Sequence, residues 1–206
     1  MRRLARAKTP KAATITRSSV LWRLAIMAEA AAAASLYREP SCLRDVGAFH
    51  KLFKAPILDT PTIPDEKRCA LRVNLIQEEL NELQEAINQK DIVEIADALA
   101  DIQYVLAGAV HEFGMGAKFA DLFEEVQRSN MSKACSSLDE AEATVAHYLA
   151  KEQPARIEEV DGKWLVYRIA DSKVLKSVNY SPASLQPILE ANDKENGGGT
   201  AAGPGN

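Results

Sequence analysis

The stretch Glu78–Asp101, EELNELQEAINQKDIVEIADALAD, contains two groups of acidic residues separated by a short polar break. Residues three and four apart lie on the same face of a helix, so Glu79 and Glu82 project together, as do Glu94 and Asp97. The break between the groups is short enough for two helices to form an antiparallel hairpin. The sequence therefore predicts two pairs of carboxylates that face each other across a helix pair.

Four carboxylates gathered in this way repel one another unless a cation lies among them, and such oxygen ligands favour Mg²⁺ or Mn²⁺ over zinc. The alternative is that the first group is only a solvent-exposed helix face, because Glu is a good helix former. The second group argues for a site, because the helix over 91–113 is apolar nearly all round and is expected to be buried. Unpaired carboxylates on a buried helix are too costly to keep without a function.

The two acidic pairs, spaced Glu-x-x-Glu and Glu-x-x-Asp, resemble the metal-binding pattern of the MazG-like, all-α nucleoside triphosphate pyrophosphohydrolases. This family includes phosphoribosyl-ATP pyrophosphohydrolase and the dimeric dUTPases. Two further segments, ADALADIQYV at 96–105 and VQRSNMSK at 126–133, are similar to its phosphoribosyl-ATP pyrophosphohydrolase-like subgroup. The resemblance extends over about residues 46–185, and it implies a nucleotide-hydrolysing helical bundle.

The resemblance implies that a nucleoside triphosphate, or a related nucleotide, is hydrolysed to the monophosphate and pyrophosphate with Mg²⁺, or alternatively Mn²⁺. The expected metal ligands are the four paired acids, Glu79, Glu82, Glu94 and Asp97. Asp101, one turn further along, could be an additional acid. Water is the expected nucleophile, and Glu78 could accept its proton, with Asp101 or a ligand carboxylate as alternatives.

The exit of the helix expected over 117–129 presents three candidate substrate-binding residues. Arg128 and Lys133 could meet phosphates as charges, while Asn130 hydrogen-bonds a base or sugar. The alternative is an ordinary polar helix end, where cations favour the helix dipole. Two rival functions share the helical fold: phosphoribosyl-ATP hydrolysis in histidine synthesis, and a non-catalytic nucleotide-binding or assembly protein.

The fold class predicted is mostly α, an antiparallel helical bundle with a small C-terminal β-hairpin. We expect a helical domain over 45–152, then a hairpin and a short helix over 153–190. Asp161-Gly162 between apolar runs predicts the hairpin turn, and a capping box formed by Ser137 and Glu140 begins the helix before it.

A homodimer is also predicted, because the helix over 91–113 carries more apolar surface than one chain can cover. A tetramer is an alternative assembly. The other alternative is that the C-terminal hairpin folds back over this apolar face within one chain.

Residues 1–44 hold 9 Lys and Arg against 2 acids, whereas residues 45–206 hold 16 against 27. A basic, Ala-rich segment nearly free of acids is typical of an organelle transit peptide. We therefore expect the mitochondrial matrix, with the plastid or cytoplasm as alternatives, and a disordered tail over 191–206. A nucleic-acid-binding arm is the alternative for the basic segment, but it lacks a motif and interleaved aromatic residues. No run approaches the roughly 20 apolar residues that span a bilayer, so no membrane partner is expected.

The cysteines and histidines form no recognisable nucleophile or zinc motif. Cys42, Cys69 and Cys135 are widely spaced, which argues for reduced thiols in an intracellular compartment. The three histidines lie outside any triad pattern, so no covalent intermediate is expected. His50 is predicted to be a structural histidine.

Overall fold

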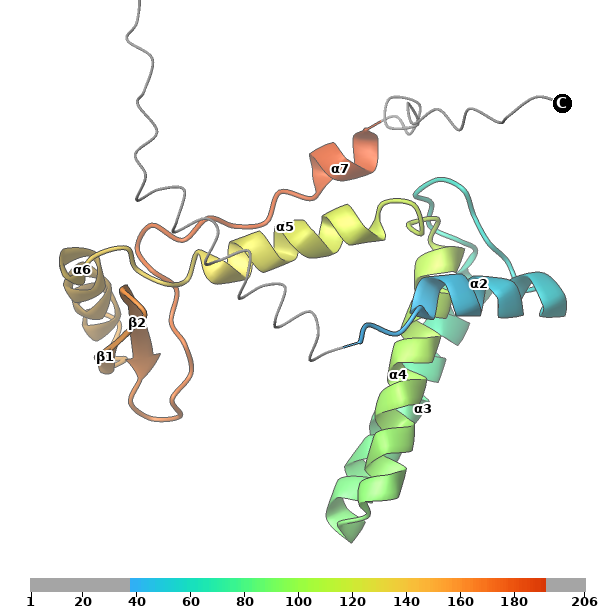
Figure 1. The fold of residues 1–206 in the computed structure, drawn as a ribbon, viewed down its shortest axis with the longest axis horizontal. Coiled ribbons are helices and arrows are strands. Elements are labelled where there is room, and N and C mark those ends of the chain that lie inside the picture. Colours follow the sequence, from blue (N-terminus) through green and yellow to red (C-terminus); the bar gives the residue numbers. More distant parts are fainter. Residues whose placement is uncertain (1–37, 192–206) are drawn as a thin grey trace, which may run out of the picture. The chain divides into compact units, whose positions relative to one another are not determined.

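The computed structural model describes residues 38–191 of the 206-residue chain. Within this part the elements are α2 (Cys42–Phe53), α3 (Glu66–Gln89), α4 (Ile92–Glu112), α5 (Phe119–Met131), α6 (Leu138–Leu149), β1 (Ala155–Val160), β2 (Lys163–Arg168) and α7 (Gln186–Glu190) (Figure 1). All of them belong to the unit Cys42–Asn206. The prediction of a mostly helical protein with a small C-terminal hairpin is confirmed. The transit peptide predicted over 1–44 and the tail predicted over 191–206 lie almost entirely outside the described residues.

The predicted helical hairpin is confirmed, and an aspartate caps the start of each of its two helices. Asp65 precedes α3 and accepts a hydrogen bond from the Arg68 N–H at 3.0 Å. Lys90 ends α3 in the left-handed region with φ 60°, and Asp91 then caps α4 by accepting from the Val93 N–H at 2.9 Å. Only two residues separate the helices, so α3 and α4 pack against each other as neighbours.

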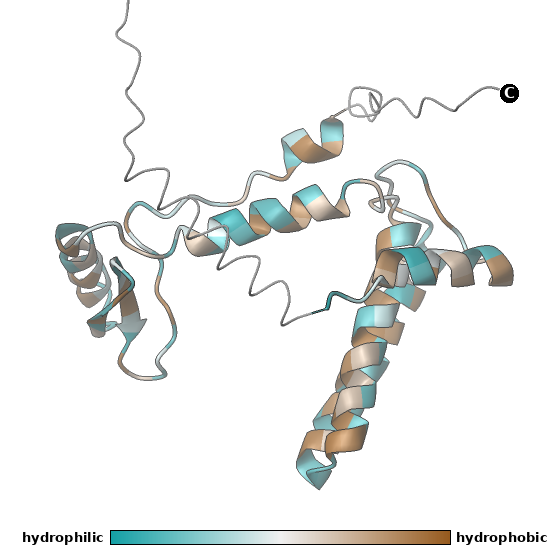
Figure 2. Ribbon diagram, viewed as in Figure 1, coloured by the Kyte–Doolittle hydropathy of each residue, from teal (hydrophilic) through white to brown (hydrophobic). Residues whose placement is uncertain are grey.

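The expectation that the helix over 91–113 is buried is wrong for the single chain. Its buried residues are Ala98 and a group near its C-terminal end, where α2 packs against it. At the other end Ile92 is 74% exposed and Val93 is 70% exposed, and Leu99 is 52% exposed. Figure 2 shows these hydrophobic turns in brown at the free end of the α3–α4 pair. The apolar pattern indicates a preference for burial, but these turns of α4 are exposed within the part of the chain that the structure describes.

The loop over 55–64, which contains three prolines, holds the C-terminal end of α4. The Leu58 N–H donates to the His111 carbonyl at 3.0 Å, and the Thr62 N–H donates to the Phe113 carbonyl at 3.0 Å. Gly114 then leaves the helix with φ +68°, and a Cβ added there would lie 1.9 Å from the Thr60 carbonyl oxygen. Glycine is therefore required at this helix end.

The β-hairpin packs on α6. Its turn residues Asp161 and Gly162 have φ of 50° and 72°, the backbone that a two-residue hairpin turn needs, so the turn prediction is confirmed. The core beneath it contains the buried residues Cys135, Ala141, Val166 and Leu175. The alternative in which the hairpin folds back over the apolar face of α4 stays a prediction.

Residues 176–184, which we call the strap, run from the hairpin back along α6 and α5. The Val178 N–H donates to Thr144 Oγ1 on α6 at 3.1 Å, and Ser177 Oγ donates to the Glu140 carboxylate. Further along, the Ser184 N–H donates to Glu125 on α5 at 2.8 Å. The strap therefore connects α6 with α5 through hydrogen bonds.

The predicted capping box at α6 is half formed. Ser137 Oγ accepts from the Glu140 N–H at 3.2 Å, as expected. The Glu140 carboxylate, however, accepts from the N–H of Ser136 at 2.9 Å instead of returning to Ser137. Because Ser177 of the strap also donates to this carboxylate, Glu140 connects the helix start to the strap.

Replacement of Glu140 with Gln is expected to destabilise the protein in a pH-dependent manner. Hydrogen bonds from Ser136 and Ser177 lower the pKa of Glu140 to about 2. This stabilisation is present above the carboxyl group's ordinary pKa and is lost as the pH falls toward 2. The variant should therefore have a lower Tm at pH 7, and the difference from wild type should shrink below about pH 4.5.

Thermal unfolding followed by circular dichroism between pH 2.5 and 7 measures this, with Glu142→Gln on the exposed side of α6 as the matched control. A Tm difference that stays constant over this pH range would contradict the assigned role of the ionised carboxylate.

No helix within residues 38–191 is both long enough and apolar enough to span a bilayer.

Candidate functional site

The six acids named from the sequence all lie on the α3–α4 hairpin. Glu78, Glu79 and Glu82 belong to α3, and Glu94, Asp97 and Asp101 belong to α4. Glu79 and Asp101 are half-buried, and the other four are exposed. The site is therefore an open, acidic side of a helix pair.

Glu79 is the acid that the others affect most clearly. Burial raises the pKa of Glu79 above its usual range, and nearby negative charges add to the rise. In decreasing order of effect these charges belong to Asp101, Glu82, Glu78 and Asp97. The structure thus brings carboxylates of both helices together, and Asp101 acts on Glu79 more strongly than any of the acids predicted as primary ligands.

Glu94 occupies a different position, in the first turn of α4. Its backbone N–H donates to the N-cap residue Asp91 at 3.3 Å. An acid is favourable at a helix N-terminus, because the unpaired N–H groups there carry partial positive charge. This gives Glu94 a structural explanation of its own, and its assignment as a metal ligand stays a prediction.

The donor set on this face consists only of carboxylate oxygens, which are the ligands that Mg²⁺ and Mn²⁺ favour. The mutual repulsion around Glu79 is also what a bound cation would relieve. Within residues 38–191, no three His, Cys, Asp or Glu side chains are arranged so that they could hold a metal ion. The residues fit the ion chemically, and binding would require the side chains to move closer together.

A second polar cluster lies further along the same helix pair, and sequence reasoning missed it. Arg68 and Arg72 of α3 both pair with Glu112 of α4; the Arg68 Nε–Glu112 Oε2 distance is 3.0 Å. Arg72 Nη2 also lies 3.3 Å from His50 Nε2. Glu112 is fully buried, and Arg72 is 7% exposed. This charged core fixes the end of the hairpin away from the connecting turn.

The environment of this cluster sets the protonation of its members. Burial alone would raise the pKa of Glu112, but hydrogen bonds from Arg72 and Arg68 outweigh it and lower the pKa below its usual range. Burial lowers the pKa of His50, so this imidazole is neutral near pH 7. A Cβ added to Gly108 would lie 2.5 Å from Arg72 Nη1, so this glycine makes room for the guanidinium group.

His50 is held by this cluster on one side and by the proline-containing loop on the other. Its Nδ1 lies 2.8 Å from the Pro56 carbonyl oxygen. Its contacts on both sides of the ring agree with the predicted structural role.

The sequence contains one clue to the charged cluster of Arg68, Arg72 and Glu112. The spacing of Arg68, Arg72 and Glu79 places the two arginines on the same face of α3 as Glu79.

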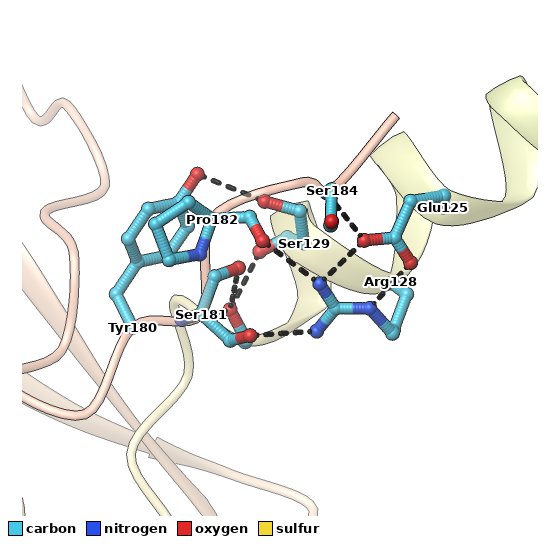
Figure 3. A network of polar contacts seen from close by, with 8 residues as sticks. Glu125, Arg128, Ser129, Tyr180, Ser181, Pro182 and Ser184 are labelled. Atoms are coloured by element: carbon cyan, nitrogen blue, oxygen red, sulfur yellow. Dashed lines mark hydrogen bonds and ion pairs between the residues drawn. The ribbon is translucent and has the colours of Figure 1, made fainter. Parts of the chain in front are cut away.

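Arg128 does not present a free guanidinium group. Its Nε and Nη2 donate to the Glu125 carboxylate at 2.7 and 2.8 Å, and its Nη1 donates to Ser181 Oγ at 3.0 Å (Figure 3). Nη2 also donates to the Pro182 carbonyl oxygen at 3.0 Å. Phosphate binding by Arg128 would have to compete with Glu125 and the strap. Its predicted role therefore carries an energetic cost that the sequence did not reveal.

Asn130 and Lys133 lie at the end of α5 and in the turn after it. Lys133 Nζ donates to Asn130 Oδ1 at 2.7 Å. The structure thus brings these two predicted substrate-binding residues together, and their contact with a nucleotide stays a prediction.

Comparison with known proteins supports the interpretation of the helical segment. Residues 46–130 match the family model described as "Phosphoribosyl-ATP pyrophosphohydrolase". A protein of Acanthamoeba polyphaga mimivirus, "Uncharacterized protein L479", is 34% identical over 92 residues, which are 43% of this chain and 37% of that protein. The chain thus matches well under half of this relative's length. The family match includes all six acids and ends before α6 and the β-hairpin, and the resemblance seen in the motifs is confirmed for this segment.

Proposed function

We propose that residues 46–130 form a domain of the phosphoribosyl-ATP pyrophosphohydrolase family. From this premise, we infer that the chain hydrolyses a nucleoside triphosphate or a related nucleotide. The products would be the nucleoside monophosphate and pyrophosphate. The observation that carries this proposal is that the matched segment contains the α3–α4 hairpin with its carboxylates on both helices.

The acids of the hairpin would hold Mg²⁺, with Mn²⁺ as the alternative ion. The proposed ligands are Glu79, Glu82, Glu94 and Asp97. Asp101 is a further candidate, because its charge has the largest effect among the neighbours of Glu79. When bound, the ion would balance the negative charge that develops on the phosphate oxygens as the α–β anhydride bond breaks.

The remaining steps are assigned to the chain's own side chains. Glu78 is exposed on α3 next to Glu79, so it can accept a proton from the attacking water, with Asp101 as the alternative base. Lys133 would meet a phosphate as a charge while Asn130 hydrogen-bonds the base or sugar. Arg128 can join them only after leaving Glu125.

Steady-state hydrolysis of phosphoribosyl-ATP and of a panel of nucleoside and deoxynucleoside triphosphates with Mg²⁺ tests the reaction. We expect pyrophosphate as a product from at least one of them. Phosphoribosyl-ATP is the specific alternative, because the matched family is described by that substrate. Absence of turnover with every substrate would favour the other alternative, a helical nucleotide-binding or assembly protein.

We also propose that the chain is a homodimer, because the exposed apolar residues of α4 form a surface that a second copy could cover. A tetramer is the alternative assembly. Analytical ultracentrifugation of the full chain at micromolar concentration is expected to give the mass of two copies. Leu99→Glu, on this surface, should shift the chain toward monomer, whereas Ile63→Glu, 82% exposed in the proline-containing loop, should not. A monomeric wild type with full activity would overturn the dimer.

The proposed location is the mitochondrial matrix, with the plastid or cytoplasm as alternatives. The support is the basic composition of residues 1–44. Mass spectrometry of the endogenous protein's N-terminus checks it, and an intact Met1 on protein purified from cytosol would contradict it.

A further inference from the structure

A basic groove lies between α6 and the strap, beyond the segment that matches the family. Its volume is about 370 Å³. It is lined by His147 and Tyr148 from the end of α6, by Lys151 just after it, and by Lys176, Ser177, Val178 and Tyr180 from the strap. Neither Asp nor Glu is among these lining residues.

Hydrogen bonds fix both walls of the groove. The Lys176 N–H donates to the Tyr148 hydroxyl at 3.2 Å, and the next strap residues bind α6 through Glu140 and Thr144. Tyr180 is held from the other side, because its hydroxyl lies 2.8 Å from Ser129 Oγ on α5. The groove is therefore a part of the fold whose strap backbone and tyrosine hydroxyls are held by hydrogen bonds within the chain.

The positive charge in the groove is not neutralised. Lys176 Nζ lies 4.3 Å from the centroid of the Tyr180 ring, and Lys151 Nζ lies 5.8 Å from that of Tyr148. Among residues 38–191, no carboxylate forms an ion pair with either lysine. Two cations are thus held over aromatic rings and remain available to an anion.

Lys133 adds a third positive charge near Tyr180. The hydrogen bond with Ser129 lowers the pKa of Tyr180 below its usual range, and the charges of Lys176 and Lys133 lower it further. The lysine predicted from the sequence to meet a phosphate therefore lies close enough to the groove to contribute to its field. The charges come from three separate segments that the strap brings together.

We propose that this groove binds a phosphate group, carried by a nucleotide or by free pyrophosphate, with Lys151 and Lys176 as its charge partners. Lysine binds phosphate as a compact point charge, and the tyrosine rings offer flat surfaces that a base could contact. The proposal is independent of the acids on α3 and α4. It adds a second anion site to the proposed function, on a part of the chain outside the family match.

Isothermal titration calorimetry of the full chain tests this, in low salt with EDTA so that no divalent ion is present. The probes are AMP, inorganic pyrophosphate and inorganic phosphate. Lys151→Gln combined with Lys176→Gln is expected to weaken binding of the best probe at least about tenfold. Lys51→Gln combined with Lys163→Gln removes the same charge from exposed positions on α2 and β2, and should leave affinity unchanged.

The probes also distinguish the source of the phosphate. Tighter binding of AMP than of inorganic phosphate indicates a nucleotide, while preference for pyrophosphate indicates the free anion. Wild-type affinity in the Lys151/Lys176 variant would overturn the proposal, as would an absence of binding by all three probes at millimolar concentration. A single-stranded RNA oligonucleotide that binds when the three probes do not would also overturn it, in favour of a nucleic-acid surface.

Failure of this proposal is separable from failure of the proposed function. Asp97→Ala, which removes a proposed metal ligand, should bind the probes as wild type does. The Lys151/Lys176 variant should keep its Mg²⁺-dependent turnover at saturating substrate. Loss of binding in both variants would contradict a separate groove site.

Discussion

Replacement of Asp97 with Ala is expected to reduce kcat by at least about 1000-fold, equivalent to ~4 kcal/mol of transition-state stabilisation. Asp97 lies on α4 among the charges that act on Glu79, so its loss removes one of the proposed ligands for Mg²⁺. Glu82→Ala, on the facing helix α3, should have a similar effect. Both side chains are exposed, so neither substitution opens a cavity and the fold should remain intact.

The melting temperature separates a loss of chemistry from a loss of structure. Because the acids around Glu79 repel one another, removal of one should leave the metal-free Tm unchanged or raise it. Asp121→Ala, an exposed acid on α5, is the control for general loss of negative charge. Wild-type turnover by Asp97→Ala at saturating Mg²⁺ would contradict the proposed site, and so would activity that survives chelation of divalent ions.

Replacement of Glu112 with Ala should cause the largest loss of stability, about 3–5 kcal/mol. Glu112 is fully buried and accepts from both Arg68 and Arg72, so its removal leaves their guanidinium groups without this carboxylate. Arg72 is itself almost fully buried, and an unpaired buried cation is costly. A decrease in Tm on the order of 10 °C follows for a chain of this size.

Chemical denaturation and calorimetry measure this change, with Glu124→Ala on the exposed side of α5 as the matched control. The double replacement Glu112→Met and Arg72→Met should recover part of the lost stability, because it removes both charges from the interior. If the Tm of Glu112→Ala lies within about 2 °C of wild type, the charged core does not hold the helix pair.

The sequence predicted those features that are encoded by neighbouring residues. Ser137 predicted the start of α6, and Asp161-Gly162 predicted the hairpin turn. The spacing of the acids likewise placed carboxylates on facing helices, because helical periodicity depends on a few residues at a time. The effect of Asp101 on Glu79 was not predictable in the same way, since the strength of an interaction across two helices depends on their axial alignment.

Features that depend on residues far apart in the chain were not predictable in this way. Arg72 and Glu112 are 40 positions apart, and Arg128 and Ser181 are 53 apart. The residues next to Arg128 and Arg72 in the sequence do not indicate that Arg128 is hydrogen-bonded to the strap or that Arg72 pairs with the buried Glu112. The exposure of α4 was not predictable either, because an apolar pattern indicates a preference for burial without identifying the surface that would cover it.

The strap has a consequence for where this protein can be shortened. A gene ending at residue 130 or 152 would encode every acid of the hairpin and the whole family match. It would also delete the partners that Arg128, Ser129 and Glu125 use on the strap. The family match therefore ends before the strap residues on which α5 depends for its tertiary hydrogen bonds.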